Sequence, residues 1–261
     1  MKKVLEIKDL SFEVFGVERK ILDDINWSVK KGEHWAMLGA NGAGKTSLLS
    51  TVCAYNTPSD GTMTVDGKCY SEYDWQKVRE RIAIVSAQLN RRIEAHENVF
   101  DAVIGGAYAM LNFWGTPSDS VRRRALQKMK ELGITYLRDS VWGTISQGER
   151  QKVLIARALM IKPAIMFLDE PCGGLDPVAR ENFIAFINDI AKSANCPPIV
   201  LATHHVEEIP PTFTHAIILK NGKVLASGAI SDVVTSEILS EAYGAKCVLG
   251  RRDSKYTLKI T

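Results

Sequence analysis

The sequence predicts an α/β fold with a parallel sheet, an N-terminal antiparallel β subdomain and a helical subdomain. Residues 25–30 alternate apolar and polar side chains, which is typical of an antiparallel strand with one face in water. Helical patterns lie between several shorter apolar segments, and this arrangement favours an α/β sandwich. These segments are continuously apolar, as parallel strands buried on both faces are: residues 35–38, 82–85, 165–168, 199–202 and 216–219.

Three further segments, near residues 4–10, 62–66 and 223–227, also have strand character. We expect them to form a small antiparallel sheet with residues 25–30. Residues 96–160 are mostly helical in character, since apolar side chains recur on one helix face. In one such helix these are Val121, Ala125, Met129 and Leu132.

The length of 261 residues fits one large domain with subdomains. We expect the central core and the antiparallel subdomain to come from residues 1–88 and 161–228. Residues 89–160 would form the helical subdomain and residues 229–261 a C-terminal tail.

Composition narrows the function classes. The chain is 46% apolar and 24% charged, and its net charge of +3 gives no reason to expect a nucleic-acid partner. Its five cysteines lie far apart without a CxxC pair, so we expect reduced thiols in a cytoplasmic protein. The N-terminus lacks the apolar core of a secretory signal, and residues 99–115 are too short and polar to span a bilayer.

Residues 39–46 fit the pattern GxxxxGK[ST], directly after a buried strand and before a helix, which is the context this motif requires. Glycines let backbone N–H groups turn around a phosphate, and the helix N-terminus adds its positive end. We expect Lys45 to bridge the β- and γ-phosphates and the Thr46 hydroxyl to bind Mg²⁺. The predicted nucleotide-binding residues of this loop are Gly39, Ala40, Asn41, Gly42, Ala43, Gly44, Lys45, Thr46 and Ser47.

Two acids follow the apolar run 165–168 at once. A buried parallel strand would bring Asp169 and Glu170 to the carboxyl edge of the sheet, where ligands bind in open α/β folds. Asp169 would hold Mg²⁺, and Glu170 would orient and deprotonate the attacking water. The alternative is that the two acids only mark a strand end in contact with water. The phosphate-binding loop (P-loop) at residues 39–46 of the same chain makes this alternative less favoured.

A third motif narrows the class. Ser146 and Glu149 form a capping box at a helix start, a common structural pattern whose helix N-terminus also suits an anion. The stretch Ser146, Gln147, Gly148, Glu149 resembles the LSGGQ signature of ABC ATPases, although Gln147 replaces the first glycine and Glu149 the glutamine. The resemblance implies that this loop binds the γ-phosphate of an ATP held by another protomer.

Other matches to this family occur in the same order along the chain. Gln88 resembles the Q-loop glutamine that senses Mg²⁺ and water, and Asp176 the D-loop aspartate that contacts the opposite protomer. His204 resembles the switch histidine that contacts the γ-phosphate, with His205 as the alternative assignment. Phe15 is the expected adenine-stacking aromatic, and Phe12 competes with it.

The resemblance implies a Mg²⁺-dependent ATPase that works as a homodimer with two ATP molecules between the protomers. We expect it to be the energy subunit of a transporter, peripheral on the inner face of the cell membrane and bound to integral membrane permease subunits. Residues 99–114 would be either ordinary core helix or a groove for a helix of such a partner. Residues 230–261 are similar to the tails of metal-chelate and molybdate importer ATPases. The alternative is a soluble non-transport ABC ATPase, for example of the iron–sulfur-cluster assembly type.

Overall fold

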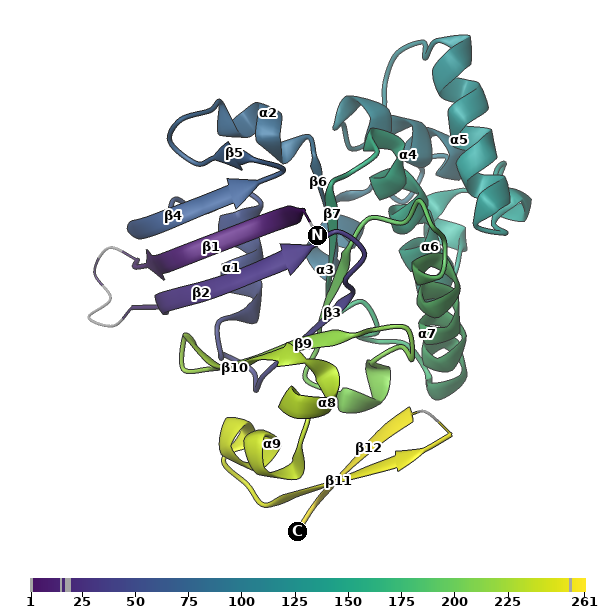
Figure 1. The fold of residues 1–261 in the computed structure, drawn as a ribbon. Coiled ribbons are helices and arrows are strands. Elements are labelled where there is room, and N and C mark those ends of the chain that lie inside the picture. The colour runs from purple at the N-terminus through teal and green to yellow at the C-terminus, as the bar shows by residue number, and fades with distance from the viewer. Residues whose placement is uncertain (1, 15, 17–19, 254) are drawn as a thin grey trace.

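The computed structural model describes residues 2–14, 16, 20–253 and 255–261, and its centre is a six-stranded sheet (Figure 1). The strand order is β10-β9-β3-β8-β7-β6, and all neighbours are parallel except β10 and β9. The strands are β3 (Trp35–Leu38), β6 (Ile82–Ser86), β7 (Ile165–Asp169), β8 (Ile199–Ala202), β9 (His215–Lys220) and β10 (Lys223–Ala229). All five apolar runs are therefore confirmed as parallel strands of one sheet.

A second sheet has the order β2-β1-β4-β5 and is antiparallel throughout. Figure 1 shows it beside the main sheet, with helix α1 between the two. Its inward side chains alternate with outward ones along β2, as the sequence predicted. The strands are β1 (Lys3–Phe12), β2 (Leu22–Lys30), β4 (Asp60–Val65) and β5 (Lys68–Cys69).

The expectation that residues 223–227 join this small sheet is wrong. They lie in β10, which pairs antiparallel with β9 at the edge of the main sheet. The reason is local: Asn221 and Gly222 have φ of 51 and 77, and Lys220 pairs with Lys223 across them. An Asn-Gly pair of this conformation makes a tight two-residue hairpin, which fixes β10 beside the strand that precedes it.

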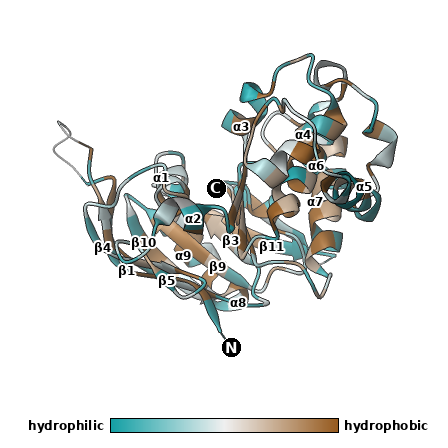
Figure 2. Cartoon of the chain, turned by 90° about the horizontal axis from the view of Figure 1, so that it is seen from above, coloured by the Kyte–Doolittle hydropathy of each residue, from teal (hydrophilic) through white to brown (hydrophobic). Residues whose placement is uncertain are grey.

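Helices cover the opposite face of the main sheet from the antiparallel sheet (Figure 1). Between β6 and β7 the chain forms α3 to α6, and α5 lies at the outside, coloured mostly hydrophilic in Figure 2. Ala125 and Met129 of α5 are buried while Arg122 and Arg123 are exposed, so the predicted helix face is confirmed. The helices are α1 (Lys45–Val52), α2 (Trp75–Arg79), α3 (Ala87–Arg92), α4 (Val99–Gly105), α5 (Asp119–Glu131), α6 (Gln147–Ala158), α7 (Pro177–Ala191), α8 (Ile230–Val233) and α9 (Ser236–Tyr243).

Each face of the main sheet has its own hydrophobic core. One core joins the sheet to the helices and the C-terminal tail, and the other joins it to α1 and the antiparallel sheet. Because the strands alternate their side chains between these two cores, they read as unbroken apolar runs in the sequence. This burial on both sides holds the carboxyl ends of β3, β6, β7 and β8 at one rigid edge.

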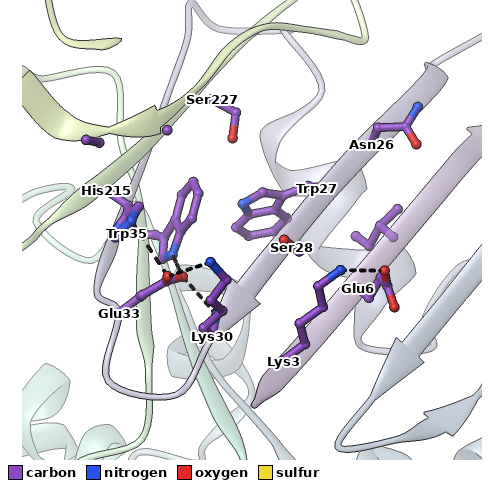
Figure 3. Close-up of a pocket in the computed structure, with 13 residues that line it drawn as sticks. Lys3, Glu6, Asn26, Trp27, Ser28, Lys30, Glu33, Trp35, His215 and Ser227 are labelled. Carbon is purple, nitrogen blue, oxygen red and sulfur yellow. Dashed lines mark hydrogen bonds and ion pairs between the residues drawn. The ribbon is translucent and has the colours of Figure 1, made fainter. Parts of the chain in front are cut away.

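The two sheets meet at a polar seam near the start of β3 (Figure 3). The Trp27 and Trp35 rings lie edge to face with centroids 5.7 Å apart, and Trp35 stacks on His215 at 4.8 Å. Glu33 accepts hydrogen bonds from Trp35 Nε1 (3.1 Å) and from the Lys30 backbone N–H (2.8 Å). A cavity of about 450 Å³ lies along this seam. The rings and the carboxylate thus fasten the antiparallel sheet to the main one.

The C-terminal tail packs beside β9. It consists of α8, α9 and a hairpin of β11 (Cys247–Arg252) and β12 (Lys255–Ile260). Among the described residues no helix has both the length and the apolar character needed to cross a membrane.

Candidate nucleotide-binding site

The loop between β3 and α1 has a backbone that only glycine adopts easily. Gly39, Gly42 and Gly44 have φ of 150, 79 and 108. At Gly39 an added Cβ atom would lie 2.5 Å from the Leu219 carbonyl oxygen, so the loop packs directly on β9. Gly44 caps α1 without a side-chain hydrogen bond, and the positive end of the helix is left for an anion.

Lys45 begins α1 and folds back into this loop. Its ammonium group donates hydrogen bonds to the carbonyl oxygens of Gly39 (2.8 Å) and Ala40 (3.2 Å), and it lies 3.7 Å from Glu170 Oε1. Burial lowers the pKa of Lys45, and the negative charges of Glu170 and Asp169 oppose that shift. A phosphate group in the loop would supply further negative charge to an ammonium that is already desolvated.

Asp169, the last residue of β7, faces Thr46 on α1. The Thr46 hydroxyl donates to Asp169 Oδ1 at 3.3 Å. Burial raises the pKa of Asp169; the Thr46 hydrogen bond and Lys45 lower it, while Glu170 adds to the rise. A cation beside the carboxylate would therefore stabilise its charged form.

This pair of oxygen donors fits Mg²⁺, which is usually held by one or two carboxylates together with phosphates and water. Within the described part of the chain, no three His, Cys, Asp or Glu side chains are grouped to hold a metal ion. The donor set thus suits an ion that arrives with a nucleotide rather than one held by protein alone.

Glu170 follows the strand in a left-handed backbone conformation, with φ of 47. This conformation is costly for a residue with a side chain, and such strain is concentrated at functional sites. The turn holds its N–H against the Ala202 carbonyl oxygen (2.9 Å), while its carboxylate lies 3.2 Å from His204 Nδ1. One carboxylate therefore contacts both Lys45 and His204.

His204 and His205 follow β8, and their rings contact each other with centroids 4.0 Å apart, but they differ in their hydrogen bonds. His204 lies against Glu170, whereas His205 is exposed and directs its backbone N–H to Thr203 Oγ1 (3.0 Å). Thr203 in turn donates to the buried Glu208 (2.5 Å), and its N–H bonds to the Met37 carbonyl oxygen (3.0 Å). These bonds tie the loop to β3 and bring His204, not its neighbour, into the site.

Residues 146–149 begin α6 as the capping box that the sequence predicted. Glu149 Oε2 accepts from both the Ser146 N–H (2.8 Å) and the Ser146 hydroxyl (2.7 Å). Burial raises the pKa of Glu149, but the Ser146 bonds and the Tyr136 hydroxyl outweigh it, so the pKa is lowered. A carboxylate that is charged at neutral pH therefore lies at this helix start.

One hydrogen bond connects this loop to the segment after Glu170, which continues into α7. Gln147 Nε2 donates to the Gly173 carbonyl oxygen at 3.2 Å, which a glycine at position 147 could not do. Asp176 caps α7 by accepting from the backbone N–H groups of Val178 and Ala179, each at 2.9 Å. Gln147, Gly173 and Glu170 line one cavity of about 490 Å³.

The remaining predicted residues are less closely joined to this cluster. Gln88 is exposed in the first turn of α3, two residues after Ser86, which pairs with Asp169 across β6 and β7. Phe15 lies outside the described residues. Phe12 is half-buried at the end of β1 and packs against the second core.

Sequence reasoning missed two tyrosines that touch the site residues. The Tyr136 hydroxyl donates to Glu149 Oε1 at 3.1 Å, and the Tyr243 hydroxyl donates to the His204 carbonyl oxygen at 3.0 Å. Neither belongs to a local motif, because each reaches its partner through the fold. For Tyr243, the only signal was its place in the tail.

Comparisons with known proteins identify the family. Residues 22–173 match a family described as ABC transporter. The chain is 41% identical over 238 residues to YlmA of Bacillus subtilis, an uncharacterized ABC transporter ATP-binding protein, covering 91% of this chain and 89% of YlmA. It superposes on cbiO1 of Clostridium perfringens, part of the ABC transporter complex cbiONQ, with a TM-score of 0.79, 28% identity and coverage of 92% and 94%.

A third likeness concerns the fold alone. A proposed metal-chelate type ABC transporter in an inward-facing conformation gives a TM-score of 0.79 at 23% identity, covering 100% of this chain and 97% of the other. The agreement extends over the C-terminal tail as well as the two sheets.

Proposed function

Because this chain belongs to the ABC transporter family and is one of its ATP-binding subunits, we propose that it hydrolyses ATP with Mg²⁺ in a homodimer that drives membrane permease subunits. The observation that carries the catalytic part is the cluster of Lys45, Glu170 and His204. Glu170 Oε1 lies 3.7 Å from Lys45 Nζ and 3.2 Å from His204 Nδ1. An ammonium that can bind phosphate, a carboxylate that can act as a base and an imidazole thus meet at one edge of the sheet.

In the proposed reaction the loop 39–44 binds the β-phosphate, and Lys45 exchanges its carbonyl partners for the β- and γ-phosphates. Glu170 then accepts a proton from the attacking water, whose oxygen bonds to the γ-phosphorus as the bond to the bridging oxygen breaks and ADP leaves. His204 stabilises the terminal phosphate. A Mg²⁺ ion held by Thr46 and Asp169, with Gln88 nearby, would neutralise phosphate charge. The left-handed turn at Glu170 keeps the base in place before the nucleotide binds.

The position of the signature loop, residues 146–149, supports the proposed dimer. Among the described residues no hydrogen bond or ion pair joins residues 146–149 to residues 39–47; the loop bonds instead to Tyr136 and Gly173. A twofold axis would place this loop of each copy over the P-loop of the other. ATP between them then favours the closed state, and hydrolysis removes the contacts that hold it.

Glu149 sets the charge of this proposed contact, and replacing it should strengthen the dimer. Glu149→Gln keeps an acceptor for Ser146 but removes a negative charge facing a phosphate. Like charges a few ångström apart in water repel by about 1 kcal/mol. We expect the ATP concentration for half-maximal dimer formation, measured by light scattering in the Glu170→Gln background, to fall about three- to ten-fold.

Glu131→Gln serves as the matched control, because Glu131 is a surface carboxylate of α5 paired with Lys128. It should leave the ATP requirement unchanged. Equal ATP requirements for the Glu149 and Glu131 variants would contradict a phosphate contact by this loop.

Residues 99–114 fall into two parts. Val99 to Gly105 form α4 in the main core, whereas residues 106–109, 111 and 112 line a groove of about 1290 Å³. Tyr108 at its rim is 42% exposed and stacks on Phe113 at 5.2 Å. Exposed aromatic side chains along a groove favour the docking of a helix from a partner protein.

The test of the transport assignment is co-purification from solubilised membranes of the source cells. Tyr108→Asp should lose an integral membrane partner while still binding ATP, because it places a charge in the groove. Ile260→Asp, at an apolar side chain 67% exposed on the tail hairpin, is the matched control and should retain the partner.

Recovery of soluble partners alone would contradict the transport role and favour the iron–sulfur-cluster assembly alternative. The family and its relatives favour transport over that alternative. We accordingly place the subunit at the inner face of the membrane, attached through its partner.

A further inference from the structure

The C-terminal tail packs against the loop that carries His204. Apolar side chains of the tail, among them Leu239, Ala242 and Cys247, share the main core with Val206 and Phe213 of the segment after β8. Figure 1 shows α9 and the β11–β12 hairpin below β9, and β12 contacts residues 206–208 of this segment. The tail is therefore in position to influence the loop.

Two hydrogen bonds join the tail to this loop. The Tyr243 hydroxyl donates to the His204 carbonyl oxygen at 3.0 Å, and the Leu258 N–H donates to Glu207 Oε1 at 2.9 Å. Tyr243 is the last residue of α9, and Gly244 ends the helix in a left-handed conformation with φ of 66. Burial raises the pKa of Tyr243 to about 12, helped by Cys247 and Glu207, so its hydroxyl remains a donor.

We infer that Tyr243 is a positioning residue for His204, through which the C-terminal tail acts on ATP hydrolysis. The inference rests on the proposed function of His204. A hydrogen bond to the His204 carbonyl fixes the peptide plane that follows this residue, and with it the direction in which the imidazole leaves the backbone. The ring is then aimed at Glu170, 3.2 Å away.

The same bond matters when a nucleotide enters. In the proposed reaction His204 leaves Glu170 for the terminal phosphate, and a fixed backbone limits this movement to rotation of the side chain. Without Tyr243 the loop would still be anchored at Thr203 and Glu208. The peptide between His204 and His205 would gain freedom, so fewer copies would hold the ring in a productive direction.

Tyr243→Phe tests the inference with the smallest change. We expect kcat to fall about two- to ten-fold, the rate equivalent of one hydrogen bond. KM for ATP should stay within about twofold, because the P-loop is untouched. Tyr256→Phe is the matched control. Tyr256 is a buried tail tyrosine whose ring lies against the Arg251 guanidinium, and removing its hydroxyl should leave kcat unchanged.

A double-mutant cycle separates positioning from general support of the fold. In a His204→Ala background, Tyr243→Phe should cause no further loss of residual turnover, since it acts through that residue. Equal kcat for the Tyr243 and Tyr256 variants, or an undiminished effect without His204, would overturn the inference. If the melting temperature of Tyr243→Phe lies well below that of Tyr256→Phe, a second variant is needed. Glu207→Ala removes the hydrogen bond from the Leu258 N–H, the other contact between tail and loop, and should itself lower kcat.

The possible results also distinguish a failure of this inference from a failure of the proposed function. Wild-type protein without ATPase activity would refute the function itself. Normal wild-type turnover with a fully active Tyr243→Phe variant would refute the tether alone.

Discussion

Replacing Glu170 with Gln is expected to lower kcat by about 10²- to 10⁴-fold, the usual contribution of a positioned base. Gln has the same shape, so it can keep the contact with His204 and the left-handed turn, but it cannot accept the proton of the attacking water. ATP binding should survive, because Lys45 and the P-loop are unchanged. The measurements are steady-state phosphate release and equilibrium binding of ATP.

The same variant should accumulate as a dimer that forms only with ATP. Hydrolysis normally removes the contacts that hold the closed state, and a slow variant keeps them. Size exclusion with light scattering should show the shift with ATP and its absence with ADP. Glu241→Gln, at an exposed tail carboxylate that pairs with Lys220, is the control and should turn over normally. Normal turnover by the Glu170 variant would show that another group is the base.

Replacing Lys45 with Ala is expected to weaken ATP binding by about 10²-fold or more. Charge-assisted hydrogen bonds are worth about 1.5–3 kcal/mol each, and Lys45 would make them to two phosphates. The loss should be large because the ammonium is 4% exposed and lies beside Asp169 and Glu170. Without it, the phosphates would face two carboxylates with no cation from the P-loop. Equilibrium binding of a labelled ATP analogue measures the effect.

Lys192→Ala provides the matched control for that experiment. Lys192 is 60% exposed and pairs with Asp189 at the end of α7, so the same charge is removed from a surface site. Its ATP affinity should equal that of the wild type. An unchanged affinity in the Lys45 variant would mean that the loop 39–46 does not bind the triphosphate.

The parts of the site that the sequence predicted are those fixed by neighbouring residues. The P-loop needs glycines at set spacings before a helix, and Asp169 and Glu170 need only a buried strand before them. Both conditions can be read from consecutive residues. The parallel strands were predicted for the same reason, since burial on both faces leaves an unbroken apolar run.

What depends on contacts between distant segments could not be predicted. Residues 223–227 are an exception, because the Asn221-Gly222 turn that pairs them with β9 is a local signal that the prediction missed. Adjacent histidines look alike in a sequence, and only the fold shows that His204 lies 3.2 Å from Glu170. Tyr243 reaches His204 across 39 positions, through packing that no local pattern encodes.

The order of strands has a consequence for biosynthesis. β3 lies at the middle of the main sheet, yet its partners are β8 and β9, with Trp35 opposite both Val200 and His215. A nascent chain therefore leaves the ribosome with β3 unpaired until most of its length has been translated. Such long-range pairing makes folding slow and leaves an apolar strand open to aggregation meanwhile. We therefore expect the unfinished polypeptide to expose β3 to aggregation, and chaperones that bind apolar segments to protect it.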